Sequence, residues 1–185
     1  MKVPRLEAAV PVHVRPPVPS LFPCRPASES IERREVDMSK QSTNKKYVLN
    51  VESISNWETD KAAEFSTLGL SDRRLKFFSS LEEGDVVITY VKATGFVDVR
   101  EIASAKVTKL GLKGKYPDGA WPWQIGTRLV VCLGIDNAVS PNKFPHTKLC
   151  AGQWRYRFQQ SGIQIDSDDG RQIAAAIEKA AKTLM

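Results

Sequence analysis

The apolar positions of this chain fall in short runs rather than in long helical stripes. Apolar runs of five or six residues predict buried strands, and strict alternation of apolar and polar residues predicts half-exposed strands. The segments with this character are 47–51, 86–91, 96–102, 105–110, 128–133 and 154–158. Segment 105–110 either continues the strand before it or pairs beside it. Segment 154–158 places basic residues on one face and aromatic residues on the other.

Helical signals are fewer and lie between or after these runs. Asn56 is a predicted N-cap, with a helix over 57–65 behind it. A second short helix is expected over 71–78, and an alanine-rich helix over 171–184 follows an acidic cap at 166–170. Many short strands with a few peripheral helices predict an α+β domain built on a small β-barrel.

The first part of the chain has a different composition. Seven of the eleven prolines in the whole chain fall before residue 27, and proline suits neither a helix interior nor a paired strand. We therefore expect residues 1–44 to form a disordered, proline-rich arm and residues 45–185 to form the domain. The arm is either translated upstream sequence with a natural start at Met38, which we favour, or a genuine flexible arm, or an organelle transit peptide.

Composition narrows the class of protein. The proportions of hydrophobic residues, 42%, and charged residues, 26%, are those of a soluble globular protein. No apolar run approaches the roughly 20 residues needed to span a bilayer, so we expect no membrane partner. A net charge of +6 fits a polyanionic partner without requiring one.

The cysteines argue against a metal or disulfide framework. Cys24, Cys132 and Cys150 form no CxxC pair and have no histidine at metal-ligand spacing. Their odd number suggests a reducing compartment, so a cytoplasmic location is expected. Cys132 lies inside an apolar run and is interpreted as a core residue. We expect neither a metal nor a cofactor.

The clearest chemical feature is a pair of tryptophans beside lysines. Trp121 and Trp123 flank a proline, and the stretch before them carries Lys109, Lys113 and Lys115. Tryptophans in such a loop can stack on bases, at about 1–3 kcal/mol per base, while lysines contact phosphates. Equally, one tryptophan could close the end of the barrel while the lysines are only solvated. Arg155 could extend a phosphate track from the strand at 154–158.

The order of these motifs resembles the EVE domain, a member of the PUA-like superfamily that is related to the YTH domain. The similarity runs from about Tyr47 to the C-terminus. Its matched segments are 47–51, 56–58, 83–85, 90–92, the strand from Phe96, 121–123, 128–131 and 161–165. The resemblance implies a PUA-like β-barrel with peripheral helices, and a pocket that accepts nucleic acid.

The same resemblance implies candidate pocket residues. Phe65 and Ser66 fall in a stretch like the one that supplies a pocket-wall tryptophan in YTH domains. Asn50 and Ser53 end the first strand near the expected pocket, and Lys92 ends the strand before the 94–95 turn. An asparagine amide both donates and accepts, so it can read a base edge, although it can equally cap a turn.

Two departures from the family pattern concern this pocket. Phe65 replaces the tryptophan. Asp98 and Arg100 follow Phe96 in a strand where EVE domains usually carry glycine.

We therefore predict a monomeric, non-catalytic module that binds RNA or DNA and places a base, modified or unmodified, in an aromatic-lined pocket. Two alternatives stay open. One is a small amidohydrolase like the PUA-like ASCH proteins, for which Lys92, Thr89 and Glu101 are the only nearby residues of suitable type. The other is a protein-interaction domain. No catalytic residue is predicted, since His146 has no partner at a defined spacing.

Overall fold

The computed structural model describes residues 45–110, 114–116, 121–152 and 157–185. The expected arm, Lys113, Arg155 and most of the expected strand at 154–158 lie outside the described residues. Arg157 and Phe158, at the end of that segment, are described and are not in a strand.

The described part is built on one six-stranded sheet with the order β2-β5-β4-β3-β1-β6. Its strands are β1 (Tyr47–Glu52), β2 (Thr67–Leu70), β3 (Val86–Val91), β4 (Gly95–Lys109), β5 (Trp123–Cys132) and β6 (Ile163–Ile165). β1 and β3 pair in parallel, and the other neighbours pair antiparallel. Residues 105–109 continue the strand that begins at Gly95 rather than forming a separate one.

The sheet is open, so the expected closed barrel is wrong, while the α+β class is confirmed. Closing a barrel requires the two edge strands to pair with each other. Here the edges are β2 and β6, with four and three residues, and they stand at opposite ends of the strand order. Helices cover the two faces of the sheet instead, and this buries its apolar residues without closure.

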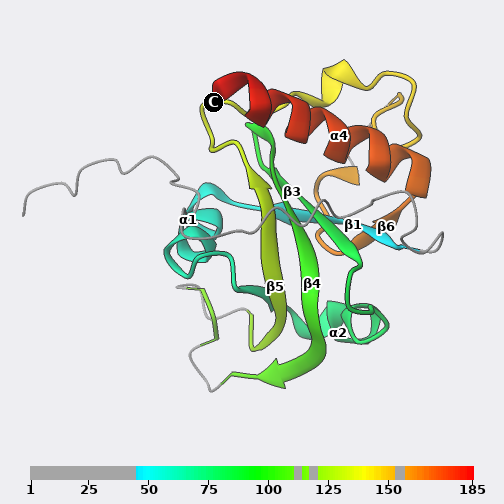
Figure 1. Cartoon of the computed structure of the whole chain (residues 1–185). Helices are drawn as coiled ribbons and strands as arrows, with labels where there is room; N and C mark the ends of the chain where they lie inside the picture. Colours follow the sequence, from blue (N-terminus) through cyan, green and yellow to red (C-terminus); the bar gives the residue numbers. More distant parts are fainter. Residues whose placement is uncertain (1–44, 111–113, 117–120, 153–156) are drawn as a thin grey trace, which may run out of the picture. The chain divides into compact units, whose positions relative to one another are not determined.

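One face is covered by the C-terminal helix α4 (Ser167–Leu184), which Figure 1 shows lying across the strands. Ile173 and Ile177 of α4 pack with Leu49 of β1 and Ile88 of β3 in the largest apolar cluster. The acidic cap is present, because Asp166 accepts a hydrogen bond from the backbone N–H of Asp168, but the helix begins at Ser167 rather than at the expected residue 171.

The opposite face is covered by α1 (Ile54–Ala62) and α2 (Leu75–Phe78). α2 follows a short 3₁₀ turn, Asp72–Arg74, so the expected short helix is present in two parts. Its Phe78 packs on Val48, Val87 and Ile125 of the sheet. Trp57 of α1 packs with Phe65, Val91 and Val97 in a separate cluster.

The first helix begins earlier than expected, because Ser53 rather than Asn56 is its N-cap. The Ser53 hydroxyl accepts a hydrogen bond from the Asn56 N–H at 3.2 Å. The helix ends at Ala62, and Glu64 and Phe65 take left-handed conformations with φ of 54° each. This reversal turns the chain into β2, a strand that the pattern did not predict.

Candidate functional site

Polar residues gather on the sheet face beneath α1, between its two apolar clusters. Asn50 and Glu52 of β1, Thr89 of β3, and Asp98 and Arg100 of β4 are all buried. Residues two apart in a strand share a face, and the register pairs Asn50 with Thr89 and Thr89 with Asp98. The strands therefore bring five polar side chains to one buried patch.

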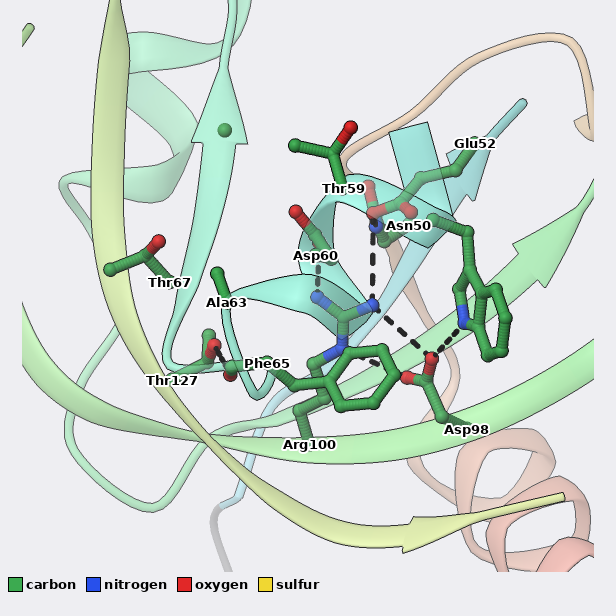
Figure 2. A network of polar contacts seen from close by, with 12 residues as sticks. Asn50, Glu52, Thr59, Asp60, Ala63, Phe65, Thr67, Asp98, Arg100 and Thr127 are labelled. Atoms are coloured by element: carbon green, nitrogen blue, oxygen red, sulfur yellow. Dashed lines mark hydrogen bonds and ion pairs between the residues drawn. The ribbon is translucent and has the colours of Figure 1, made fainter. Parts of the chain in front are cut away.

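Arg100 is the centre of this patch, and its side chain is fully buried. Its Nη1 donates to Asp60 Oδ2 of α1 at 2.5 Å. Its Nε and Nη2 donate to the two oxygens of Asp98 at 3.0 and 3.2 Å. Glu52 Oε1 lies 3.9 Å from Nη2. Figure 2 shows the guanidinium between these three carboxyl groups. Removing one partner of such a buried pair lowers the free energy of unfolding by about 3–5 kcal/mol.

The aromatic residue expected to wall the pocket lies against this arginine. The guanidinium carbon of Arg100 lies 4.7 Å from the centroid of the Phe65 ring, and Figure 2 shows the two groups face to face. Phe65 also packs against Trp57, whose indole N–H donates to Asp98 at 2.7 Å. The Phe65 side chain is only 3% exposed.

A second cation enters the same network. Lys115 Nζ lies 2.6 Å from Asp60 Oδ1 and also donates to the carbonyl of Thr67. Burial lowers the pKa of Lys115 by more than the Asp60 carboxylate raises it. The side chain is 8% exposed, so Lys115 is an internal group and not part of a solvated lysine cluster.

The charges of the network balance if Glu52 carries a proton. Burial raises the pKa of Glu52 to about 8, although Arg100 acts to lower it. Burial would lower the pKa of Arg100, but Asp98, Glu52 and Asp60 together raise it. Glu52 Oε2 has no hydrogen-bond partner within the described part of the chain, which a protonated carboxyl tolerates better than a carboxylate.

Asp60 also receives the hydroxyl of Tyr116. Tyr116 donates to Asp60 Oδ1 at 2.9 Å and accepts from the Gly69 N–H at 3.2 Å. A Cβ at position 69 would lie 2.4 Å from Tyr116 Cε2, so the close approach requires glycine. The Tyr116 ring meets the Trp121 ring edge-on at 5.8 Å, and the Lys115 N–H donates to the Trp121 carbonyl. The anchored segment 114–116 thus contacts Trp121 directly.

The two predicted tryptophans lie near the tip where β4 turns into β5, and both are partly exposed. Trp123 pairs with Lys109 of β4 and Leu70 of β2. Its indole N–H donates to Asp72 at 2.7 Å, and Lys109 Nζ lies 5.3 Å from its ring centroid. Lys109 itself is exposed. The structure therefore brings Trp123 and Lys109 together, while Trp121, two residues earlier, contacts Tyr116.

The other predicted contact residues lie elsewhere. Lys92 follows β3 at the far end of the sheet, beside a groove of about 550 Å³ lined also by Tyr90, Ser140 and Asn142. β4 spans fifteen residues between these two ends, roughly 45 Å along the strand at about 3.3 Å per residue. A single nucleotide cannot contact both Lys92 and Trp123.

Asn50, Ser53 and Ser66 make hydrogen bonds within the protein. The Asn50 amide donates to Glu52 and accepts from the Ser161 hydroxyl. Ser53 caps α1. Ser66 is exposed beside Phe65 and donates to the Ala63 carbonyl. The capping role considered as an alternative is therefore present for Ser53, whereas the Asn50 amide bonds the side chains of Glu52 and Ser161 instead.

The residues considered for an amidohydrolase are dispersed. Thr89 is fully buried under α1. Glu101 pairs with Lys45 and Arg128, and in register with Val86 at the start of β3. Lys92 follows the other end of that strand. No group of three metal-binding side chains occurs in the part of the chain that the structure describes. No described helix is both long and apolar enough to cross a bilayer.

Sequence reasoning did not identify Asp60, Arg100 or Tyr116 as members of one site. One signal was available: Asp98 and Arg100 have opposite charges and stand two apart in a predicted strand, so they share a face. Their other partners come from α1 and β1, and the β4–β5 connection joins through Asp60; no local pattern links these segments to that strand.

No protein-family model and no curated protein sequence matches this chain. Solved YTH domains do share its fold. The YTH domain of the Zygosaccharomyces rouxii MRB1 protein, in complex with N6-methyladenosine RNA, matches with a TM-score of 0.54 and 14% identity over 74% of this chain and 88% of that one. The YTH domain-containing protein mmi1, in a complex with RNA, gives a TM-score of 0.57 at 13% identity over 76% and 86%.

A third structure agrees with these two. The Pho92 YTH domain in complex with m6A gives a TM-score of 0.56 at 12% identity over 74% of this chain and 85% of that one. The chain therefore has a YTH-like fold, as the resemblance implied, whereas no family match supports the narrower EVE assignment.

Proposed function

We propose that this domain is a non-catalytic module that binds single-stranded RNA. The YTH domains that share its fold are described in complexes with RNA. The observation that carries the proposal is the tip of the β4–β5 hairpin, where Trp121 and Trp123 are both partly exposed and Lys109 lies over the Trp123 ring. Aromatic faces beside an exposed cation form a typical platform for stacked bases and their phosphates.

The base contact belongs to this tryptophan pair rather than to Phe65. Lys109 is an exposed, flexible lysine, and an exposed cation–π contact is worth only about 0.5–1 kcal/mol. A base can displace it, because stacking returns about 1–3 kcal/mol. The Asp72 carboxylate holds the indole of Trp123 in place, so little ordering of this side chain is needed on binding.

The other predicted site residues have different roles in the proposed binding of RNA. Lys109, Lys113 and Arg155 contact phosphates, and Lys92 marks a separate contact at the other end of the sheet. Lys115 anchors the loop through Asp60 instead of contacting RNA. Asn50, Ser53 and Ser66 support the elements around α1.

Fluorescence anisotropy of labelled single-stranded RNA and DNA of the same sequence tests the proposal. Trp123→Ala should weaken RNA binding about tenfold, given the usual stacking energy. Val130→Ala is the matched control, because Val130 is 47% exposed in the same strand but away from the tip. Equal binding by both variants and the parent would exclude the tip as the RNA site. Tighter binding of DNA than of RNA would contradict the choice of RNA.

A further inference from the structure

We propose that Arg100 is a built-in occupant of the site beside Phe65, and that this domain therefore binds RNA without distinguishing N6-methyladenosine from adenosine. The part of this inference that concerns RNA rests on the proposed function. The position of Arg100 in the site is independent of that function.

The Arg100 guanidinium has a shape that suits the site beside Phe65. A guanidinium is a flat group that stacks on an aromatic ring as a base does. The Arg100 guanidinium lies 4.7 Å from the Phe65 ring centroid. It takes the place beside the ring that a stacked ligand would need, as the overlap of the two groups in Figure 2 illustrates.

The neighbouring groups are also engaged. Trp57 packs on Phe65 and uses its indole N–H on Asp98. The Asn50 amide is bonded to Glu52 and Ser161. An entering base would meet aromatic and amide groups that already have partners inside the protein.

The cost of displacing the guanidinium is high. Asp60 and Asp98 are fully buried, and their hydrogen bonds to Arg100 would be lost without replacement by water. A buried carboxylate without its cation is more costly than one base stack is favourable. One added methyl group changes this balance little, so neither adenosine nor its methylated form opens the site.

This places the selectivity at one position. A smaller side chain at position 100 would remove the guanidinium from the Phe65 ring. Arg100 is thus a specificity-determining residue, which acts by filling a site rather than by contacting a ligand.

The first test uses the unmodified full chain and two RNAs that differ only in one N6-methyl group. Their dissociation constants should agree within about twofold, and a preference of about tenfold or more for the methylated RNA would overturn the inference. If neither RNA binds, the proposed function fails, and the inference is then decided by a measurement that needs no RNA.

That measurement is the NMR signal of the Arg100 side-chain Nε–H, which donates to buried Asp98 and should exchange slowly with water. The signal is assigned through its connectivity to the Arg100 backbone in the isotope-labelled parent protein. Adding millimolar N6-methyladenosine or adenosine should leave it unshifted. A saturable shift with the methylated nucleoside would show that the site opens to a ligand.

The third test is a change of selectivity. Arg100→Lys keeps the charge but removes the planar group from Phe65, so the variant should prefer methylated RNA by more than about threefold. Arg128→Lys, whose side chain is 73% exposed, is the matched control and should show no preference. A folded Arg100→Lys protein with no preference would overturn the role of Arg100. If that variant does not fold, the two measurements on the parent chain decide.

Discussion

The ammonium of Lys115 lies 2.6 Å from the carboxylate of Asp60, and this ion pair joins the connection between β4 and β5 to helix α1. Asp60 also accepts hydrogen bonds from the Arg100 guanidinium and the Tyr116 hydroxyl. One buried carboxylate therefore links the core of the sheet to the segment that contacts Trp121. The proposed RNA contact depends on this residue, although Asp60 is far from solvent.

Asp60→Asn should loosen this anchor. The amide keeps the size of the carboxylate but leaves Arg100 and Lys115 with one negative charge fewer. We expect the free energy of unfolding to fall by about 3 kcal/mol, as for other broken buried pairs, measured by urea denaturation. Proteolysis within 110–122 should be faster and RNA binding weaker. Asp136→Asn, at an exposed position, is the control. Unchanged proteolysis and affinity in Asp60→Asn would show that the loop is held by other contacts.

Gly69→Ala should destabilise the domain through Tyr116. The new methyl group would lie 2.4 Å from the tyrosine ring, and overpacking of this kind costs about 1–3 kcal/mol. Thermal unfolding measures the loss. The new methyl group clashes only with the ring of Tyr116. The double change Gly69→Ala with Tyr116→Leu should therefore lower the free energy of unfolding by less than the sum of the two single changes. Strictly additive effects would argue against the contact.

Stability should depend on pH through Glu52. Its folded pKa of about 8 lies above the ordinary value of 4.5, so the native state holds this proton over a range in which the unfolded chain has lost it. Stability from this group is therefore greatest below about pH 4.5, falls as the pH rises, and levels off above about 8, with a slope of at most about 1.4 kcal/mol per pH unit.

Glu52→Gln isolates this effect, because it cannot ionise but still offers an oxygen to Asn50. Urea denaturation at several pH values between 5 and 8, set at about one-unit steps, should show a shallower decline for the variant than for the parent. Parallel curves would mean that Glu52 has an ordinary pKa.

Lys109→Ala should change the salt dependence of RNA binding. A lysine that neutralises one phosphate of a single strand contributes about 0.7 to the slope of log affinity against log salt. The variant should show a slope lower by about that amount, measured by anisotropy over a salt series. Lys179→Ala, an exposed lysine on α4, should leave the slope unchanged. A lower slope for Lys179→Ala together with an unchanged slope for Lys109→Ala would place the RNA on the α4 side of the domain.

Local patterns were sufficient for much of the fold. The apolar run of β3, the alternation in β4 and the acidic cap of α4 each depend on residues close together in the chain. They predicted these elements and the α+β class. The pairing of Trp123 with Lys109 was also predictable, because a hairpin returns the chain to where it began. The missed strand β2 has only four residues, too few for a periodic signal.

Only the tertiary structure decided how charged residues are used. Nothing local distinguishes Lys115, which is buried against Asp60, from Lys109, which is exposed on Trp123. Nothing local shows that Arg100 lies on Phe65. The partners of Arg100 are 2, 40 and 48 residues away in the chain, and a charge can be buried only where folding brings its counter-charges to it. The sequence by itself thus determined β1, β3, β4, the second half of β5 and most of the helices. The meeting of β1, β4, α1 and the 114–116 segment decided which site is open and which is filled.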